Sequence, residues 1–268
     1  MGQVVDASAG RISRRHFVAA AVIAACGRSA SQENAGTAMI KPPADRSTAR
    51  LAARPRVPSL QIGSGLKPLE LTRGPRDGLI YVPAGYQWER PTAFALLLHG
   101  AGGSAQDVVA NSGPLADATG TIILAVDSRL QTWDVLRGGY GPDVAFIDRS
   151  LEWAFAHCAV DRSRVAVGGF SDGASYALSV GLANGDLFTH VLAFSPGFAL
   201  PPAVVGKPQI FMSHGTEDQI LPIDSTSRIF VPQLRRAGYQ VRYREFVGPH
   251  TVPLDVAKEA LAWFSAAE

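Results

Sequence analysis

Short apolar runs alternate with amphipathic segments along the later part of the chain, and this alternation is the strongest constraint on the fold. Five runs are apolar almost throughout: residues 93–98, 121–126, 164–168, 190–194 and 209–213. Strands buried on both faces of a parallel sheet have this composition. Other segments show helical or late-strand spacing, namely 144–159, 174–183, 225–236, 240–246 and 254–266. We therefore predict an α/β domain with a doubly wound, mostly parallel sheet and helices on both faces.

The beginning of the chain lacks this alternation and has the pattern of an export signal. Arg14 and Arg15 precede a run of apolar and small residues that ends at Ala25. This run is shorter than the roughly 20 residues that a membrane-spanning helix needs. A charged start followed by a short apolar stretch is typical of a cleaved signal, and the arginine pair resembles the twin-arginine type. We predict an export signal over residues 1–26 and a protein located in the periplasm, in the cell envelope or outside the cell.

Cys26 ends a second pattern within this signal. Residues 23–26, Ile-Ala-Ala-Cys, resemble a lipobox, in which the cysteine thiol receives a diacylglycerol. Lipidation of Cys26 would anchor the protein to a bacterial membrane; in the alternative, the signal is simply cleaved and Cys26 has no role. Residues 27–66 are rich in Ser, Ala, Pro and Arg without an apolar period, which predicts a flexible tether. The folded domain is then expected over residues 67–268.

Charge and cysteine content exclude several classes of protein. Residues 1–56 carry a net charge of +6, whereas residues 57–268 carry −4, so the folded part offers no basic surface for nucleic acid. Two cysteines are too few for a disulfide framework. The six histidines are scattered, and no two of them have ligand spacing beside acids or cysteines. We expect no metal ion and no organic cofactor.

The residues that follow each apolar strand are the candidates for chemistry, because ligands bind at the carboxyl ends of parallel strands. After the strand at 164–168, residues 169–173 read Gly-Phe-Ser-Asp-Gly and lead into a helix. Glycines flanking a serine at this spacing allow a strand to turn sharply into a helix with the serine at the apex. Taken alone, the pentapeptide also fits a tight turn in which Ser171 caps the helix. The other strand ends decide between these interpretations.

A glycine-rich turn, residues 100–103, follows the first apolar strand and His99. The backbone N–H groups of such a turn can stabilise a developing oxyanion. We expect Ala101 or Gly102 to provide one donor and Asp172, the residue after the serine, to provide the other. His99 itself is expected to hold the turn by hydrogen bonds rather than to react.

Two further strand ends carry an acid and a base. Asp218 follows the fifth apolar strand, where a carboxylate can orient an imidazole; Glu217 and Asp224 are the alternative acids. His250 lies between the last strand and the last helix, where it can reach the serine as general base. The order Ser171, Asp218, His250 along the chain is that of an α/β-hydrolase triad. This order favours nucleophilic catalysis over the helix-cap interpretation.

Four segments together resemble the α/β-hydrolase superfamily, and within it the phospholipase/carboxylesterase branch. They are residues 98–103, 169–174, 214–218 and 250–253. Polyhydroxybutyrate depolymerase-like and dienelactone hydrolase-like esterases are similar too. The resemblance implies ester hydrolysis through an acyl-enzyme on Ser171, without a cofactor. The carboxylate of Asp172, where many relatives have a small or apolar residue, departs from the pattern and leaves the accepted acyl group open.

The segment after the fourth strand bears on substrate size. Residues 195–208 contain four prolines and are too short for a helical lid, so we expect no large cap domain and an open site. An open site suits a small-molecule ester or a bulky acylated substrate. Trp133, Phe198 and Leu200 lie on loops at strand ends and are expected to line the substrate pocket; the alternative is ordinary packing.

The main expectation is therefore a serine carboxylesterase. The same triad also serves lysophospholipases, acyl thioesterases, feruloyl or polyester-type esterases, peptidases and transacylases, because only the leaving group or the acceptor differs. A protein of another class, a surface lipoprotein that binds ligands on an inactive hydrolase fold, is the remaining alternative. The presence of the serine, the histidine and the aspartate disfavours that alternative.

Overall fold

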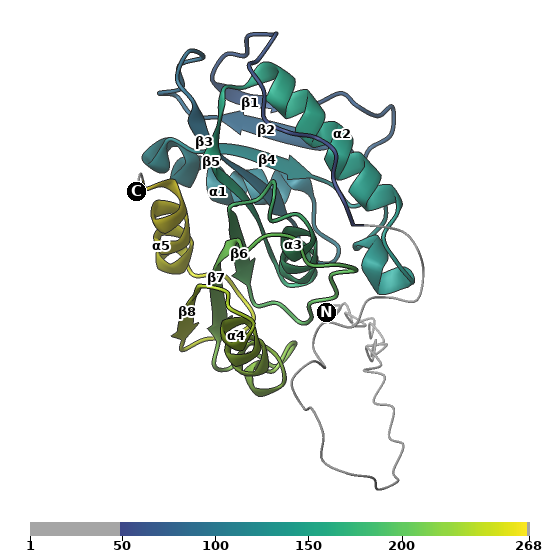
Figure 1. Ribbon diagram of the computed structural model, residues 1–268, viewed down its shortest axis with the longest axis vertical. Coiled ribbons are helices and arrows are strands. Elements are labelled where there is room, and N and C mark those ends of the chain that lie inside the picture. Colours follow the sequence, from purple (N-terminus) through teal and green to yellow (C-terminus); the bar gives the residue numbers. More distant parts are fainter. Residues whose placement is uncertain (1–48, 267–268) are drawn as a thin grey trace, which may run out of the picture. The chain divides into compact units, whose positions relative to one another are not determined.

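The computed structural model describes residues 49–266, which contain one eight-stranded sheet (Figure 1). The strands lie in the order β1-β2-β4-β3-β5-β6-β7-β8. Their bounds are Gly65–Pro68, Gly78–Val82, Thr92–Leu98, Ile122–Val126, Val160–Phe170, His190–Phe194, Gln209–Gly215 and Val241–Phe246. The six neighbouring strands β4-β3-β5-β6-β7-β8 pair in parallel. At one edge, β2 pairs antiparallel with β4, and β1 pairs antiparallel with β2. The predicted α/β fold with a mostly parallel sheet is confirmed.

Five α-helices cover the two faces of this sheet. They are α1 (Ala105–Thr119), α2 (Pro142–His157), α3 (Asp172–Ala183), α4 (Ser227–Arg236) and α5 (Leu254–Ser265). Strand β3 shows why two faces exist, because its side chains alternate between two buried clusters. Phe94 and Leu96 pack with side chains of α2, α3 and α4, whereas Ala95 and Leu97 pack with side chains of α1 and α5. Helices α1 and α5 therefore share one face of the sheet.

Two strands and one α-helix were not predicted from the sequence: the antiparallel strands β1 and β2, and helix α1. Helix α1 contains Gly113 and Pro114, two residues that weaken a helical pattern. Its ends carry clear signals nonetheless. The hydroxyl of Ser104 accepts a hydrogen bond from the backbone N–H of Asp107, and Gly120 ends the helix in the left-handed region with φ 64°. Helix α1 matters for function because it begins directly after the turn at 100–103.

The N-terminal strap, which we define as residues 49–62, packs against the folded domain. Asn184 forms two hydrogen bonds with it, accepting from the N–H of Leu51 and donating to the carbonyl of Ala49. Three strap side chains join the main buried cluster: Ala49, Leu51 and Ala53. The prediction of a flexible tether over residues 27–66 is therefore wrong for residues 49–66, and the folded domain begins before residue 67. Alternating small apolar residues at 49, 51 and 53 were the signal that the compositional argument passed over.

Several sequence predictions fall outside the described residues. These are the export signal over residues 1–26, the lipidation of Cys26 and the tether over residues 27–48. Within the described part, helices long and apolar enough to cross a membrane are absent. The segment from 195 to 208, between β6 and β7, forms no helix, in keeping with the expectation that no helical cap is inserted there.

Candidate active site

Three side chains from three strand ends meet at the carboxyl edge of the sheet. Ser171 follows β5, Asp218 follows β7, and His250 follows β8. The Nε2 atom of His250 lies 2.9 Å from the Oγ atom of Ser171, and its Nδ1 atom lies 2.6 Å from Oδ2 of Asp218. A histidine between a serine and a buried carboxylate at these distances can take the hydroxyl proton and hold it as an imidazolium. The structure thus brings together the three residues predicted as a triad.

Ser171 sits at a strained turn between β5 and α3. Its backbone has φ 57° and ψ −120°, a conformation that residues with a side chain rarely adopt. The flanking glycines make this turn possible. A Cβ atom on Gly169 would lie 2.6 Å from the backbone of Gly173, and a Cβ atom on Gly173 would lie 2.3 Å from the carbonyl oxygen of Leu98. Only residues without a side chain fit at these positions, which explains the Gly-x-Ser-x-Gly spacing.

The carboxylate of Asp218 is buried and hydrogen-bonded on both oxygens. Its Oδ1 atom accepts from the backbone N–H groups of Ile220 and Leu221, at 2.9 and 2.8 Å, which leaves Oδ2 to His250. Burial favours the neutral acid, but these donors outweigh it and lower the pKa of Asp218 below its ordinary value. The alternative acids are excluded by position: Glu217 is exposed, and Asp224 forms an exposed ion pair with Arg228.

His214 is a site residue that the sequence analysis did not single out. Its Nε2 atom lies 2.8 Å from the carbonyl oxygen of Leu221 and 3.1 Å from Oδ2 of Asp218. A carbonyl only accepts, so Nε2 carries the proton and Nδ1 accepts from the hydroxyl of Ser227, 2.7 Å away. Burial lowers the pKa of His214, which keeps it neutral near pH 7. Its position just before Gly215 and the predicted acid was the available signal.

One of the three predicted oxyanion donors is excluded, and the other two stay predictions. The N–H of Gly102 donates to the carbonyl oxygen of Gln131 at 2.7 Å, so Gly102 cannot serve as a donor to substrate. The sequence showed the glycine-rich turn but not its partner across space. The N–H groups of Ala101 and Asp172 donate to no protein atom within residues 49–266. Asp172 directly follows Ser171, and Ala101 follows Gly100, on which a Cβ atom would lie 3.4 Å from Cβ of Ser171. They remain as the candidate pair of oxyanion donors.

Asp172 also has a side-chain partner that explains its presence beside the nucleophile. Its Oδ2 atom accepts a hydrogen bond of 2.7 Å from the hydroxyl of Thr132, on the loop that follows β4. This bond ties the carboxylate to that loop. The negative charge nevertheless stays one residue from Ser171, where it disfavours an anionic acyl group.

His99 holds the turn at 100–103, as predicted. Its Nε2 atom accepts from the N–H of Ser128 at 3.0 Å, so Nδ1 carries the proton and donates to the carbonyl of Gly100 at 2.6 Å. Burial lowers the pKa of His99, so its imidazole is neutral near pH 7. The same Gly100 carbonyl accepts from the N–H of Gly103, which closes the turn.

The three predicted pocket residues are packing residues and are not among those that line the cavity described below. Trp133 is fully buried, stacks on Tyr176 with ring centroids 5.0 Å apart, and donates its indole N–H to the carbonyl of His99. Phe198 and Leu200 pack against the main buried cluster. Aromatic residues on strand-end loops fill the core as readily as they line a site, and the sequence offered no means of telling these apart.

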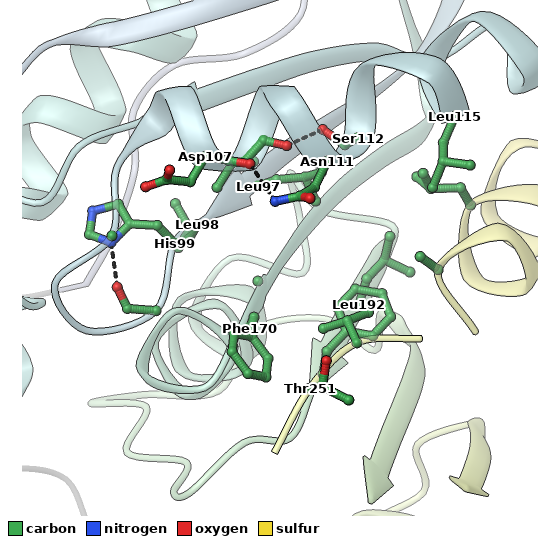
Figure 2. A pocket seen from close by; sticks show the side chains of 18 of the residues that line it. Leu97, Leu98, His99, Asp107, Asn111, Ser112, Leu115, Phe170, Leu192 and Thr251 are labelled. Carbon is green, nitrogen blue, oxygen red and sulfur yellow. Dashed lines mark hydrogen bonds between the residues drawn. The ribbon is translucent and has the colours of Figure 1, made fainter. Parts of the chain in front are cut away.

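A cavity of about 540 Å³ lies beside the triad instead (Figure 2). It is bounded by α1 on one side and by α5 on the other, with side chains of β3, β5 and β6 beneath. Figure 2 shows Asn111, Ser112 and Leu115 along α1, facing Phe170 and Leu192 across the cavity. The sequence analysis missed this cavity because it had not predicted α1.

The described part of the chain contains no cluster of metal ligands. Among residues 49–266, no three His, Cys, Asp or Glu side chains gather in a way that could hold a metal ion. Cys158 is buried in the core, and burial raises the pKa of its thiol to about 12. This thiol is therefore protonated and unreactive at neutral pH.

Comparison with known proteins adds family and fold relationships. Residues 144–253 match the phospholipase/carboxylesterase family. The chain is 30% identical over 145 residues to NocK of Nocardia uniformis subsp. tsuyamanensis, which is named as an esterase; the match covers 50% of this chain and 42% of NocK. It is 29% identical over 157 residues to feruloyl esterase C of Emericella nidulans, with 56% of this chain and 57% of the relative covered.

Solved structures show the same architecture at lower sequence identity. The S-formylglutathione hydrolase FrmB of Staphylococcus aureus superposes with a TM-score of 0.62 and 14% identity, over 77% of this chain and 99% of that one. The curated relatives, in contrast, are matched over only 42% to 66% of their lengths. Residues 144–253 thus resemble the phospholipase/carboxylesterase family, and the sheet order and strand-end geometry of the described residues are those of an α/β-hydrolase fold.

Proposed function

We propose that this protein is a serine hydrolase that cleaves carboxylic esters through an acyl-enzyme intermediate. The observation that carries the proposal is the position of His250, which lies within hydrogen-bond distance of both Ser171 and the buried Asp218. Strain at Ser171 and the unpaired N–H groups of Ala101 and Asp172 support the same chemistry. The family match supports hydrolysis of an ester bond.

In the first step, Nε2 of His250 takes the hydroxyl proton of Ser171 while Oγ forms a bond to the ester carbonyl carbon. The carbonyl electron pair moves onto its oxygen, and the N–H groups of Ala101 and Asp172 donate hydrogen bonds to that oxyanion. Asp218 stabilises the imidazolium through Nδ1. The carbonyl then re-forms, the bond to the leaving oxygen breaks, and the proton on Nε2 passes to that oxygen.

In the second step, water replaces the alcohol. His250 takes a proton from the water molecule as its oxygen attacks the acyl carbon, and the same two N–H groups stabilise the second oxyanion. When this intermediate collapses, the bond to Ser171 breaks and the proton returns to Oγ. The products are a carboxylic acid and the free enzyme. Every proton moves through Nε2 of one imidazole, so the reaction needs no further group.

The test is hydrolysis of p-nitrophenyl esters, from acetate to decanoate, by the purified full-length protein. We expect activity that Ser171→Ala abolishes and that a fluorophosphonate blocks by labelling Ser171. Ser163, an exposed serine near the amino end of β5 and therefore away from the carboxyl strand ends that carry the triad, provides the matched control. Ser163→Ala should keep full activity. No hydrolysis by the wild type, or full hydrolysis by Ser171→Ala, would refute the proposal.

The same experiment compares acyl groups and leaving groups. The acyl-enzyme chemistry is shared by oxygen esters of alkyl and aryl alcohols and by thioesters. Methyl ferulate and an acyl thioester therefore belong in the panel beside the p-nitrophenyl esters. The similarity to feruloyl esterase C makes methyl ferulate the informative member. A kcat/KM for methyl ferulate above that for alkyl esters would assign the protein to that substrate class.

We further propose that the protein is exported and anchored to a bacterial membrane through Cys26. The arginine pair, the short apolar run and the lipobox-like residues 23–26 support this location. Metabolic labelling with a fatty-acid analogue tests it in a bacterial host. Label in the wild type that is lost in Cys26→Ser would support the anchor. Export without label would leave a cleaved signal as the correct interpretation.

A further inference from the structure

The cavity between α1 and α5 is lined by residues that adjoin the triad. Gly100 and Phe170 line it, and a Cβ atom on Gly100 would lie 3.4 Å from both the Phe170 ring and Cβ of Ser171. The Phe170 ring in turn packs against the His250 ring, with centroids 4.6 Å apart. Thr251, the residue after His250, lines the opposite side. Residues that line the cavity thus contact both the nucleophile and the general base.

Most of the cavity wall is apolar. Besides Ala101 of the oxyanion turn, eleven aliphatic or aromatic residues line it: Leu97, Leu98, Val108, Leu115, Phe170, Leu192, Phe194, Val252, Leu254, Ala257 and Leu261. Its volume of about 540 Å³ lies within the range of small-molecule sites, roughly 300–1,000 Å³. An apolar ligand gains free energy here in proportion to the surface that it removes from water.

The polar side chains that α1 contributes to the wall are paired within the protein. Ser112 donates its hydroxyl proton to the carbonyl of Val108. Asn111 donates to the backbone of Asp107, and Asp107 accepts from Ser104 at the exposed rim of the cavity. The lining contains no lysine or arginine that would bind an anionic ligand, and its donors without a protein partner, the N–H of Ala101 and the hydroxyl of Thr251, belong to the oxyanion turn and to the residue after His250. Its chemistry selects a flexible hydrocarbon.

We propose that this cavity binds the aliphatic chain of the ester substrate, which makes α1 and α5 the elements that determine chain-length specificity. The inference rests on the proposed ester hydrolysis. Either the acyl group or the alkoxy group of the ester can enter the cavity, since Gly100 belongs to the oxyanion turn and Thr251 directly follows the general base. The shared chemistry is a saturated chain, and separate substrate series identify whether it belongs to the acid or to the alcohol.

The experiment uses two series of esters with the full-length protein: p-nitrophenyl esters of lengthening acids, and acetates of lengthening alcohols. Each methylene buried in the cavity should raise kcat/KM about threefold to fourfold until the cavity is filled. The rise is expected in one of the two series. A rise with acid length places the acyl chain in the cavity, and a rise with alcohol length places the alkoxy chain there.

Two variants narrow the cavity from opposite walls, and each has a matched control on the same helix. Ala257→Phe on α5 and Val108→Phe on α1 fill it; Ala262→Phe and Ala110→Phe place the same side chain on exposed positions outside it. The ratio of kcat/KM for the octyl-length ester to that for the two-carbon ester should fall at least about tenfold in the filled variants. The ratio should stay unchanged in the controls.

Failure of this proposal is distinguishable from failure of the proposed function. Ser171-dependent hydrolysis with equal length dependence in filled and control variants would overturn the chain site and leave the esterase intact. If no ester is hydrolysed, binding of n-decanol measured by calorimetry decides the matter. Binding by the wild type and both controls, with a negative heat-capacity change and loss in Ala257→Phe, would support the chain site. Equal binding by all variants, or none by the wild type, would overturn it.

Discussion

Nε2 of His214 lies 3.1 Å from Oδ2 of Asp218, the same carboxylate oxygen that the imidazole of His250 reaches at 2.6 Å. Two imidazoles thus share one oxygen, while the other oxygen is occupied by two backbone N–H groups. A carboxylate held in this way cannot rotate without losing several hydrogen bonds. We therefore expect His214 to be a positioning residue that orients Asp218 and moderates the charge that Asp218 presents to His250.

Replacing His214 by leucine should lower kcat with little change in KM. A hydrogen bond to a charged group contributes about 1.5–3 kcal/mol, which corresponds to roughly 10- to 100-fold in rate when it is lost in the transition state. Without the second donor, the carboxylate holds the imidazolium form of His250 more strongly. The acid limb of the pH profile of kcat/KM should therefore move to higher pH.

His214→Gln is the matched variant for this test. Its amide N–H can reach the position of Nε2 and donate again to Asp218, so we expect partial recovery of both kcat and the pH profile. A purely structural role of His214 would lower the melting temperature and the amount of active enzyme, but it would leave the pH profile in place. An unchanged profile in His214→Leu would contradict the positioning role.

Asp218→Asn should reduce kcat by about 10⁴-fold while the fold is kept. The two backbone N–H groups of Ile220 and Leu221 would select the amide oxygen, which turns the amide NH₂ towards His250. Nδ1 of His250 must then accept, so Nε2 carries the proton and cannot take one from Ser171. Single-turnover kinetics of acylation measure this loss. Glu217→Gln and Asp224→Asn, the alternative acids, should retain full activity.

The sequence predicted those parts of the site that depend on local spacing along the chain. Ser171, Asp218 and His250 were predictable because each follows a strongly apolar strand, and parallel strands end at the same edge. Gly102 and Trp133 were assigned wrongly because their partners, a carbonyl at residue 131 and an aromatic stack with Tyr176, come from other segments. Contacts of this kind depend on tertiary packing, which no periodicity in the sequence encodes.

The cavity was hidden for a related reason. It exists because α1 and α5 meet on one face of the sheet without filling the space between them, and Gly113 and Pro114 had obscured α1. The ordered structure of the strap at 49–62 was missed for a different reason, because its composition predicted disorder. Its composition is that of a disordered segment, yet side-chain partners on α2 and near the end of α3 pair its backbone. Composition describes a free chain and not a chain that finds such partners.

Gly173→Ala should abolish activity and lower stability by roughly 3 kcal/mol or more, as for other severe steric clashes in a core. The added Cβ would lie 2.3 Å from the carbonyl oxygen of Leu98, so the serine turn or β3 has to move. Gly113→Ala is the matched control, because its Cβ would meet only Tyr81 at 3.6 Å inside α1. That control should be neutral or stabilising by about 0.5–1 kcal/mol. Thermal unfolding of both variants decides; equal melting temperatures would contradict the prediction.

Asp172→Asn should raise kcat/KM for neutral esters. The asparagine oxygen can still accept the hydrogen bond from Thr132, so the loop contact stays while the negative charge beside the oxyanion donors disappears. Removing one nearby like charge from a partly screened site favours the oxyanion by about 1 kcal/mol, or a few-fold in rate. A cationic choline ester should gain less than a neutral ester of equal length. Lower activity with neutral esters would show that the carboxylate has a positive role.

Asp186 anchors the strap, and its replacement by asparagine should loosen residues 49–56 without unfolding the domain. Arg50 binds both carboxylate oxygens, at 2.8 and 2.7 Å, and Arg54 binds one at 2.6 Å. The Arg50 guanidinium, together with Arg54, lowers the pKa of Asp186 well below its ordinary value. These side chains are about a third exposed, so the effect should be local: faster hydrogen exchange in the strap and a melting temperature nearly unchanged.

The ion pairs of Asp186 with Arg50 and Arg54 should make the stability of the strap depend on pH, and the direction of this dependence follows from the lowered pKa of Asp186. A carboxyl group whose pKa is lower in the folded state contributes stability above its unfolded value of about 3.9, and this contribution is lost as the pH falls through the folded value. The resistance of residues 49–56 to proteolysis should therefore be constant from neutral pH down to about 4 and decline below it. Asp186→Asn should remove this decline, because it titrates no proton. Limited pepsin digestion between pH 2 and pH 4 measures it, and equal pH dependence in both proteins would assign the decline to another group.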